Sequence, residues 1–388
     1  MTTTPPTADT ATAAEPVPAE TRTERVSRSI RIETEALIAA IVAGVLGSAF
    51  AAVMFWGTYT LIWAGWNASW SVGSAAMIAV IVLGLATCIV SYHRCRRLPE
   101  QLWRRGLPRW KALVDTVAVS LVHTALAVMV TGTVFSVAQL AFRRLAVGQY
   151  VGTAMVLAAV SLTTYTLYLS VAQLSTMALA HRLLLFMGGG VLLSMTTSPD
   201  PLWWQRQFSY LGTFGDQPSW IFNGTLIVAG VLVTTFAMYV NRDLRTLHDR
   251  GIVRYRWSTP TITVMFIVLG ILLAGIGLVP ENVTTPGHNT IAASTSLAFA
   301  ALLLIAPVAL RGMPWSFLLL TLGCLALLVG AVLLYLNASY FNLTAFEVVA
   351  FAILFGWIAV LARFMAAMLG RGIGEQSTVV VEAETPAP

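Results

Sequence analysis

Residues 315–336 read WSFLLLTLGCLALLVGAVLLYL, a run of 22 residues without a single charged side chain. A helix needs about 20 apolar residues to cross the roughly 30 Å hydrocarbon core of a bilayer, so this run predicts a transmembrane helix. The rest of the chain has the same character, because 57% of its 388 residues are hydrophobic and only 10% are charged. Soluble proteins carry about 25% charged residues. The composition therefore excludes a water-soluble protein and predicts an all-α, polytopic membrane helix bundle.

Nine further apolar segments precede or follow this run. The segment 183–197 is short for a full span and contains Gly188, Gly189 and Gly190, so we expect it to be broken, tilted or continued by the Trp-rich residues after it. The sequence thus predicts ten transmembrane helices, the other nine having approximate limits of 36–61, 72–90, 112–141, 151–180, 183–197, 220–240, 261–279, 291–310 and 343–369.

Polar tails enclose the apolar part of the chain. Residues 1–32 are rich in Pro, Thr, Ala and Glu, and residues 371–388 are polar and acidic. Such segments bury too little apolar surface to offset the entropy of ordering them, so both are predicted to be disordered. The first apolar run is longer than the ~7–15 residues of a signal peptide core, so it predicts a membrane span rather than a signal peptide. Between the tails we expect a four-helix membrane region, 33–180, and a six-helix membrane domain, 181–370.

The basic residues predict the orientation. Ten spans place 20 of the 23 Lys and Arg residues on the side of the termini and leave Arg143, Arg144 and Arg206 on the other side. Positively charged loops stay cytoplasmic, so both termini are predicted to be cytoplasmic. The strong preference for Arg over Lys is typical of a GC-rich bacterial genome, which suggests a bacterial inner membrane. Because the basic residues lie in membrane-proximal turns, no nucleic-acid partner is expected.

The longest loop on the predicted inner side, residues 93–111, interleaves Trp and Leu with arginines. Such a segment can lie on an anionic leaflet with its Trp and Leu side chains in the interface. Alternatively it is simply the most cytoplasmic loop, obeying the charge rule.

Three ionisable residues fall inside or at the edge of predicted spans. Asp115 and His123 are eight residues apart, nearly on one helical face, and Glu347 stands near the outer start of the last span. Such groups often relay protons or bind cations, although a lone His is more often a hydrogen-bonded core residue. Asp115 follows Lys111 closely enough to be solvated or paired, which leaves His123 as the deeply placed group. The cysteine and histidine spacing predicts neither a metal site nor a cofactor.

Two loops on the predicted outer side, 196–224 and 277–289, carry the richest polar chemistry. In and beside these loops the sequence contains the motifs Ser209-Tyr-Leu-Gly212, Phe222-Asn223, Gly230, Gly277-Leu-Val-Pro280 and His288-Asn289. Together these motifs resemble the bacterial membrane family known as domain of unknown function 998 and, more distantly, the Frag/DRAM/Sfk-type membrane proteins. The resemblance covers roughly His181 to Leu369. It implies a six-helix domain with these loops outside the cytoplasm and no established biochemical activity.

The two outer loops are expected to form one polar pocket. In the first hypothesis a non-enzymatic protein binds, or helps to move, a membrane lipid or other amphiphile there. In the second, a membrane hydrolase or transferase acts on a lipid-linked substrate with His288 as acid or base, aided by Glu281 or Asp216. A small-solute transporter is the third possibility, and protein partners are not predicted. The candidate binding residues are Asn223, His288, Trp203, Trp204, Arg206, Ser209 and Trp220.

Overall fold

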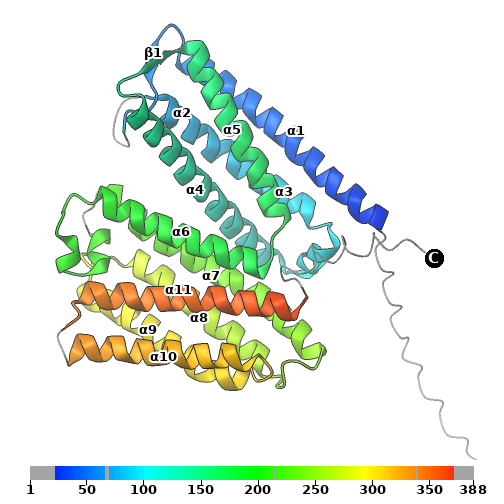
Figure 1. The fold of residues 1–388 in the computed structure, drawn as a ribbon, viewed down its shortest axis with the longest axis vertical. Coiled ribbons are helices and arrows are strands. Elements are labelled where there is room, and N and C mark those ends of the chain that lie inside the picture. The colour runs from blue at the N-terminus through cyan, green and yellow to red at the C-terminus, as the bar shows by residue number, and fades with distance from the viewer. Residues whose placement is uncertain (1–21, 66–69, 214, 216, 338–339, 371–388) are drawn as a thin grey trace, which may run out of the picture.

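The computed structural model describes residues 22–65, 70–213, 215, 217–337 and 340–370. Within these ranges ten helical segments are long and apolar enough to cross a membrane, which confirms the predicted all-α membrane bundle. Figure 1 shows two groups of helices, α1 to α5 and α6 to α11, that run in different directions. The described chain starts and ends at the right-hand side of that view, as ten crossings require.

The N-terminal group contains four spans, one of which is assembled from three consecutive helical segments with a π-helical turn, η1, in the middle. Strands β1 and β2 pair antiparallel, with Tyr59 opposite Gly148, and join the left-hand ends of two spans. The elements are α1 (Arg22–Met54), β1 (Tyr59–Leu61), α2 (Val72–Ala79), η1 (Val80–Gly84), α3 (Leu85–Cys95), α4 (Arg109–Ala141), β2 (Ala146–Gly148) and α5 (Gln149–Ala172).

The C-terminal group contains six spans, with two short 3-10 helices in the connection after the first of them. Helices α7 and α8 pack closely at Gly230, where a Cβ atom would lie only 2.4 Å from the carbonyl oxygen of Gly270. The absence of a side chain at Gly230 permits this approach, as small residues commonly do in membranes. The elements are α6 (Thr176–Thr197), η3 (Trp203–Gln205), η4 (Phe208–Gly212), α7 (Gln217–Asp249), α8 (Ser258–Leu278), α9 (Thr285–Ala309), α10 (Trp315–Leu336) and α11 (Leu343–Met368).

Helix α6 corrects the expectation of a broken fifth span. It runs without interruption for 22 residues from Thr176. The Ser175 side chain caps it by accepting a hydrogen bond from the Ala178 N–H at 3.1 Å. Gly190 serves packing rather than a break, since a Cβ there would lie 2.2 Å from Thr225 Oγ1 on α7. The chain therefore reverses at residues 173–175, and Arg182 lies on α6 rather than in a loop.

Two other boundaries differ from the sequence-based prediction. Helix α1 begins at Arg22, so residues 22–32, which we expected to be disordered, are helical. The same helix ends at Met54, and the apolar residues that follow enter β1 instead of extending the span. The predicted disorder of residues 1–21 and 371–388 lies outside the described residues.

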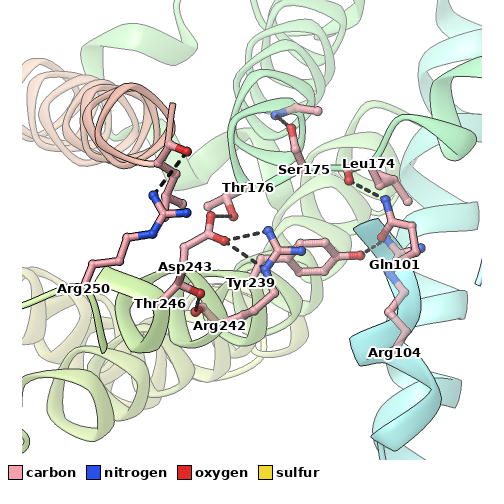
Figure 2. Close-up of polar contacts among 12 residues, drawn as sticks. Gln101, Arg104, Leu174, Ser175, Thr176, Tyr239, Arg242, Asp243, Thr246 and Arg250 are labelled. Carbon is pink, nitrogen blue, oxygen red and sulfur yellow. Dashed lines mark hydrogen bonds and ion pairs between the residues drawn. The ribbon is translucent and has the colours of Figure 1, made fainter. Parts of the chain in front are cut away.

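The segment between α3 and α4 joins the two groups of helices. It forms a 3-10 helix, η2 (Pro99–Gly106). Two of its polar side chains, Gln101 and Arg104, are buried, with 3% and 0% of their surface exposed. Gln101 Nε2 donates to the carbonyl oxygen of Leu174 at 2.8 Å, and Arg104 donates to the Tyr239 hydroxyl of α7 (Figure 2). The sequence offered two alternatives for this loop, a solvated cytoplasmic loop or a segment lying on the leaflet. The burial of Gln101 and Arg104 against other helices corrects both.

A buried ion pair anchors this junction. Arg104 Nε lies 3.9 Å from Asp115 Oδ2, and both side chains are fully buried. Tyr92 of α3 also donates to the Asp115 carboxylate, and the Tyr239 hydroxyl lies 3.4 Å from Asp115 Oδ1. Burial acts to lower the pKa of Arg104, but Tyr239 and Asp115 raise it above its ordinary value, so the guanidinium stays charged. Asp115 is thus paired, which is one of the two alternatives that the sequence left open, and it is buried as His123 is.

Candidate functional site

A cavity of about 250 Å³ lies in the C-terminal group, between η4 and helices α7 to α11. Large apolar side chains make most of its wall, and a smaller set of polar side chains comes from η4, α9, α10 and α11. The apolar residues include Phe222, Leu226, Ile276, Phe299, Leu328, Phe351 and Leu354. The polar residues are Ser209, His288, Asn289, Thr295, Ser296, Tyr335 and Glu347. We call this space the His288 cavity, and the end of the bundle that holds it the His288 end.

His288 is placed by the first turn of α9. The Thr284 side chain accepts from the Gly287 N–H at 3.3 Å and starts the helix. The His288 ring is 3% exposed, and its Nδ1 lies 2.7 Å from the carbonyl oxygen of Val279. A carbonyl oxygen only accepts, so Nδ1 donates this hydrogen bond, and in the neutral imidazole Nε2 carries a lone pair. Nε2 has no hydrogen-bond partner within the described part of the chain.

A carboxylate and a hydroxyl share the cavity with His288. Glu347 Oε2 accepts from the Phe208 N–H at 2.7 Å, which ties the start of α11 to η4. Ser209, the next residue of η4, is 6% exposed and also lines the cavity. Between the described residues no hydrogen bond joins His288 to Glu347 or to Ser209. The three groups therefore face one space without forming a connected relay.

The loops 196–224 and 277–289 contact each other, as the sequence predicts. Asn282 Nδ2 donates to the carbonyl oxygen of Thr213 at 3.1 Å. Asn223 Nδ2 donates to the carbonyl oxygen of Gly212 at 2.9 Å and holds η4 over the start of α7. Asn223, a candidate binding residue, thus supports the loop and is not one of the residues that line the cavity.

Trp203, Trp204, Arg206 and Trp220 are not among the residues that line the cavity. Trp203 packs on Phe208 with a ring separation of 6.4 Å. Trp204 and Trp220 are 49% and 77% exposed. The Arg206 guanidinium lies 4.5 Å from the centre of the Tyr210 ring.

Of the two candidate catalytic residues that the structure describes, His288 lines the cavity and Glu281 does not. Glu281 is partly exposed. Asp216 lies outside the described residues. The carboxylate that accompanies His288 is Glu347, which sequence reasoning treated as a separate intramembrane group. The signal for this pairing was available, because α9 and α11 both start at the same end of the bundle.

Within the described ranges no three His, Cys, Asp or Glu side chains gather closely enough to hold a metal ion. The site consists instead of hydrogen-bonding groups at one end of an apolar, aromatic chamber. Such an arrangement can hold a molecule that has both a polar group and an apolar part.

Fold and site define a multi-pass α-helical membrane protein with an amphipathic cavity in its C-terminal half. The model of the family DUF998, described as a protein of unknown function, matches residues 183–363. Residues 183–363 thus match DUF998, as the motif resemblance predicts, and the matched stretch contains every residue that lines the cavity. No curated protein matches the chain, and no solved structure does.

Proposed function

We propose that the C-terminal domain binds, or helps to move, a lipid or other amphiphile through the His288 cavity. The observation that carries this proposal is the unpartnered Nε2 of a 3% exposed histidine beside a largely apolar chamber of about 250 Å³. A buried nitrogen without a partner is costly, and a bound polar group would supply the missing hydrogen bond. The positive-inside count supports an extracytoplasmic location for this end of the bundle, and a bacterial inner membrane is part of the proposal.

The size and chemistry of the cavity restrict the ligand. Ligand pockets commonly measure about 300–1,000 Å³, so this space suits a small polar group with an apolar segment rather than a whole two-chain lipid. The lone pair of His288 Nε2 and the carboxylate of Glu347 both accept hydrogen bonds. A ligand that carries hydroxyl or amine hydrogens fits these acceptors better than a bare phosphate does. The exposed Trp204 and Trp220 suit the membrane interface around the site.

The test compares the lipids that co-purify with three forms of the full-length protein, measured by mass spectrometry. Ala292→Trp places a large ring in the cavity lining, whereas Ala326→Trp adds the same ring on the exposed surface of α10. We expect a lipid or amphiphile that is retained by the wild type and by Ala326→Trp but is lost from Ala292→Trp. Identical profiles for all three proteins would contradict the proposal.

A second candidate function follows from Ser209, His288 and Glu347 lining one cavity. A hydroxyl, an imidazole and a carboxylate are the groups that an acyl-transfer enzyme uses, so a hydrolase or transferase acting on a lipid-linked substrate is the alternative. Activation of Ser209 would require His288 within hydrogen-bond reach, and the described contacts of His288 do not include it. Substitution of His288, described in the Discussion, separates the two functions.

A further inference from the structure

A second polar site lies in a groove between α4, α5 and α6, where the two groups of helices meet. The groove has a volume of about 510 Å³ and mostly apolar walls. Two of its residues, Val130 and Leu185, are 62% and 65% exposed, so the groove opens toward the lipid phase. Its polar lining residues are His123 of α4, Thr163, Thr166 and Ser170 of α5, and His181 and Arg182 of α6.

Arg182 brings a positive charge into this groove. Ser170 holds the side chain: Arg182 Nη2 donates to the Ser170 hydroxyl at 2.6 Å and to its carbonyl oxygen at 3.0 Å. These contacts leave donors of the guanidinium unused, and no described carboxylate forms an ion pair with it. A charged side chain in a span is expensive and marks a functional site by default. Arginine is also well suited to phosphate, which it can bind with two parallel hydrogen bonds.

The position of Arg182 along α6 fits a lipid headgroup. It lies six residues after the start of the helix at Thr176, about 9 Å along the axis at a rise of ~1.5 Å per residue. Arg182 is therefore nearer to the end of α6 that lies opposite the His288 end, and from there a long arginine side chain can extend its guanidinium toward the headgroups. Basic pockets between helices at this level are known to bind anionic headgroups.

His123 provides an independent sign of a ligand. Its ring is 3% exposed, and its Nδ1 donates to the carbonyl oxygen of Val119 at 2.7 Å. Nε2 therefore presents a lone pair, and it has no hydrogen-bond partner within the described ranges. The groove thus offers a cationic donor and, separately, a buried acceptor. A ligand with both an anion and a hydroxyl would satisfy the two together.

We propose that this groove binds an anionic phospholipid whose headgroup carries a hydroxyl. Its phosphate contacts Arg182, its headgroup hydroxyl donates to His123 Nε2, and its acyl chains lie along the exposed apolar walls beside Val130 and Leu185. The proposal does not depend on the function assigned to the His288 cavity, because the two sites share no residue.

The experiment measures lipid binding to the full-length protein in detergent by native mass spectrometry. Three lipids with the same acyl chains are compared: phosphatidylglycerol, phosphatidylethanol, which has the same charge but no headgroup hydroxyl, and zwitterionic phosphatidylcholine. We expect affinity to fall in that order. Arg182→Gln should weaken phosphatidylglycerol binding about tenfold or more, the effect of losing a charge-assisted hydrogen bond. His123→Phe should lower phosphatidylglycerol to the level of phosphatidylethanol.

Two controls accompany these variants. Arg256→Gln removes an exposed arginine that does not line the groove and should leave binding unchanged. Arg182→Lys keeps the charge and should retain part of the affinity. If Arg182→Gln does not fold, the wild-type comparison of the three lipids still decides, because equal affinities would overturn the proposal. It would also be overturned if Arg182→Gln bound phosphatidylglycerol normally, if His123→Phe kept the preference over phosphatidylethanol, or if water-soluble glycerophosphoglycerol bound as tightly as the lipid.

Discussion

The guanidinium of Arg104 lies 3.9 Å from the carboxylate of Asp115, and both side chains are completely buried between the two groups of helices. The pair connects η2 to α4, while Tyr239 brings α7 to the same point. A charged group that is buried in this way depends on its partner, because the described residues offer Arg104 no second carboxylate. Through Tyr239, this buried pair ties the N-terminal group to the C-terminal group.

Removing one member of this pair should destabilise the protein. Asp115→Asn leaves Arg104 as an uncompensated buried charge, and breaking a buried pair in this way costs about 3–5 kcal/mol. We therefore expect a clear fall in the thermal unfolding temperature of the purified protein in detergent. Asp249→Asn, an exposed carboxylate at the end of α7, is the matched control and should change little. If Asp115→Asn unfolded at the wild-type temperature, the pair would not be holding the junction.

Substitution of His288 separates binding from catalysis at the cavity. His288→Gln should retain ligand in the co-purification assay, because an amide still hydrogen-bonds, although its geometry differs. His288→Phe should lose the ligand, since it has no polar atom. An amide cannot act as a base at neutral pH, so an enzyme would lose its function in the Gln variant at unchanged abundance in the membrane. Failure of His288→Gln to complement a deletion phenotype at normal expression would favour the enzyme.

Accessibility labelling tests the orientation. The native cysteines Cys88, Cys95 and Cys324 are buried, so the background should be low. Val283→Cys, at a position that is 71% exposed in the connection before α9, should react with an impermeant reagent in intact cells. Arg256→Cys, at the opposite end, should react only after the membrane is opened. The reverse pattern would invert the proposed orientation.

The contact between α7 and α8 should not tolerate a side chain at Gly230. A Cβ there would lie 2.4 Å from the Gly270 carbonyl oxygen, a backbone atom that cannot move aside alone. Overpacking of this kind costs about 1–3 kcal/mol and sometimes more, so Gly230→Ala should lower the unfolding temperature. Gly323→Ala on α10 meets open space within 4 Å and should leave that temperature unchanged. Equal temperatures for the two variants would show that the helices can separate at little cost.

The sequence predicts the number of spans because the apolar run that makes a span is a local property. The ten runs correspond to the ten helices, and the motifs of the two loops identify the family domain that contains the His288 cavity. Boundaries were less predictable. The apolar run 151–180 continues through the turn at 173–175, so its composition hides the turn, and the one available signal was Ser175 as a helix cap.

The pairings between distant residues were decided by the tertiary structure. Glu347 and His288 line one cavity, and Arg182 and His123 line one groove. The Arg104 side chain contacts Asp115 and Tyr239. Transfer into the membrane depends on the hydrophobicity of each segment by itself, which is why the sequence alone determined an all-α bundle of ten spans. Which helix faces meet depends on packing and on the partners available to each buried polar group, and these exist only once the helices are assembled.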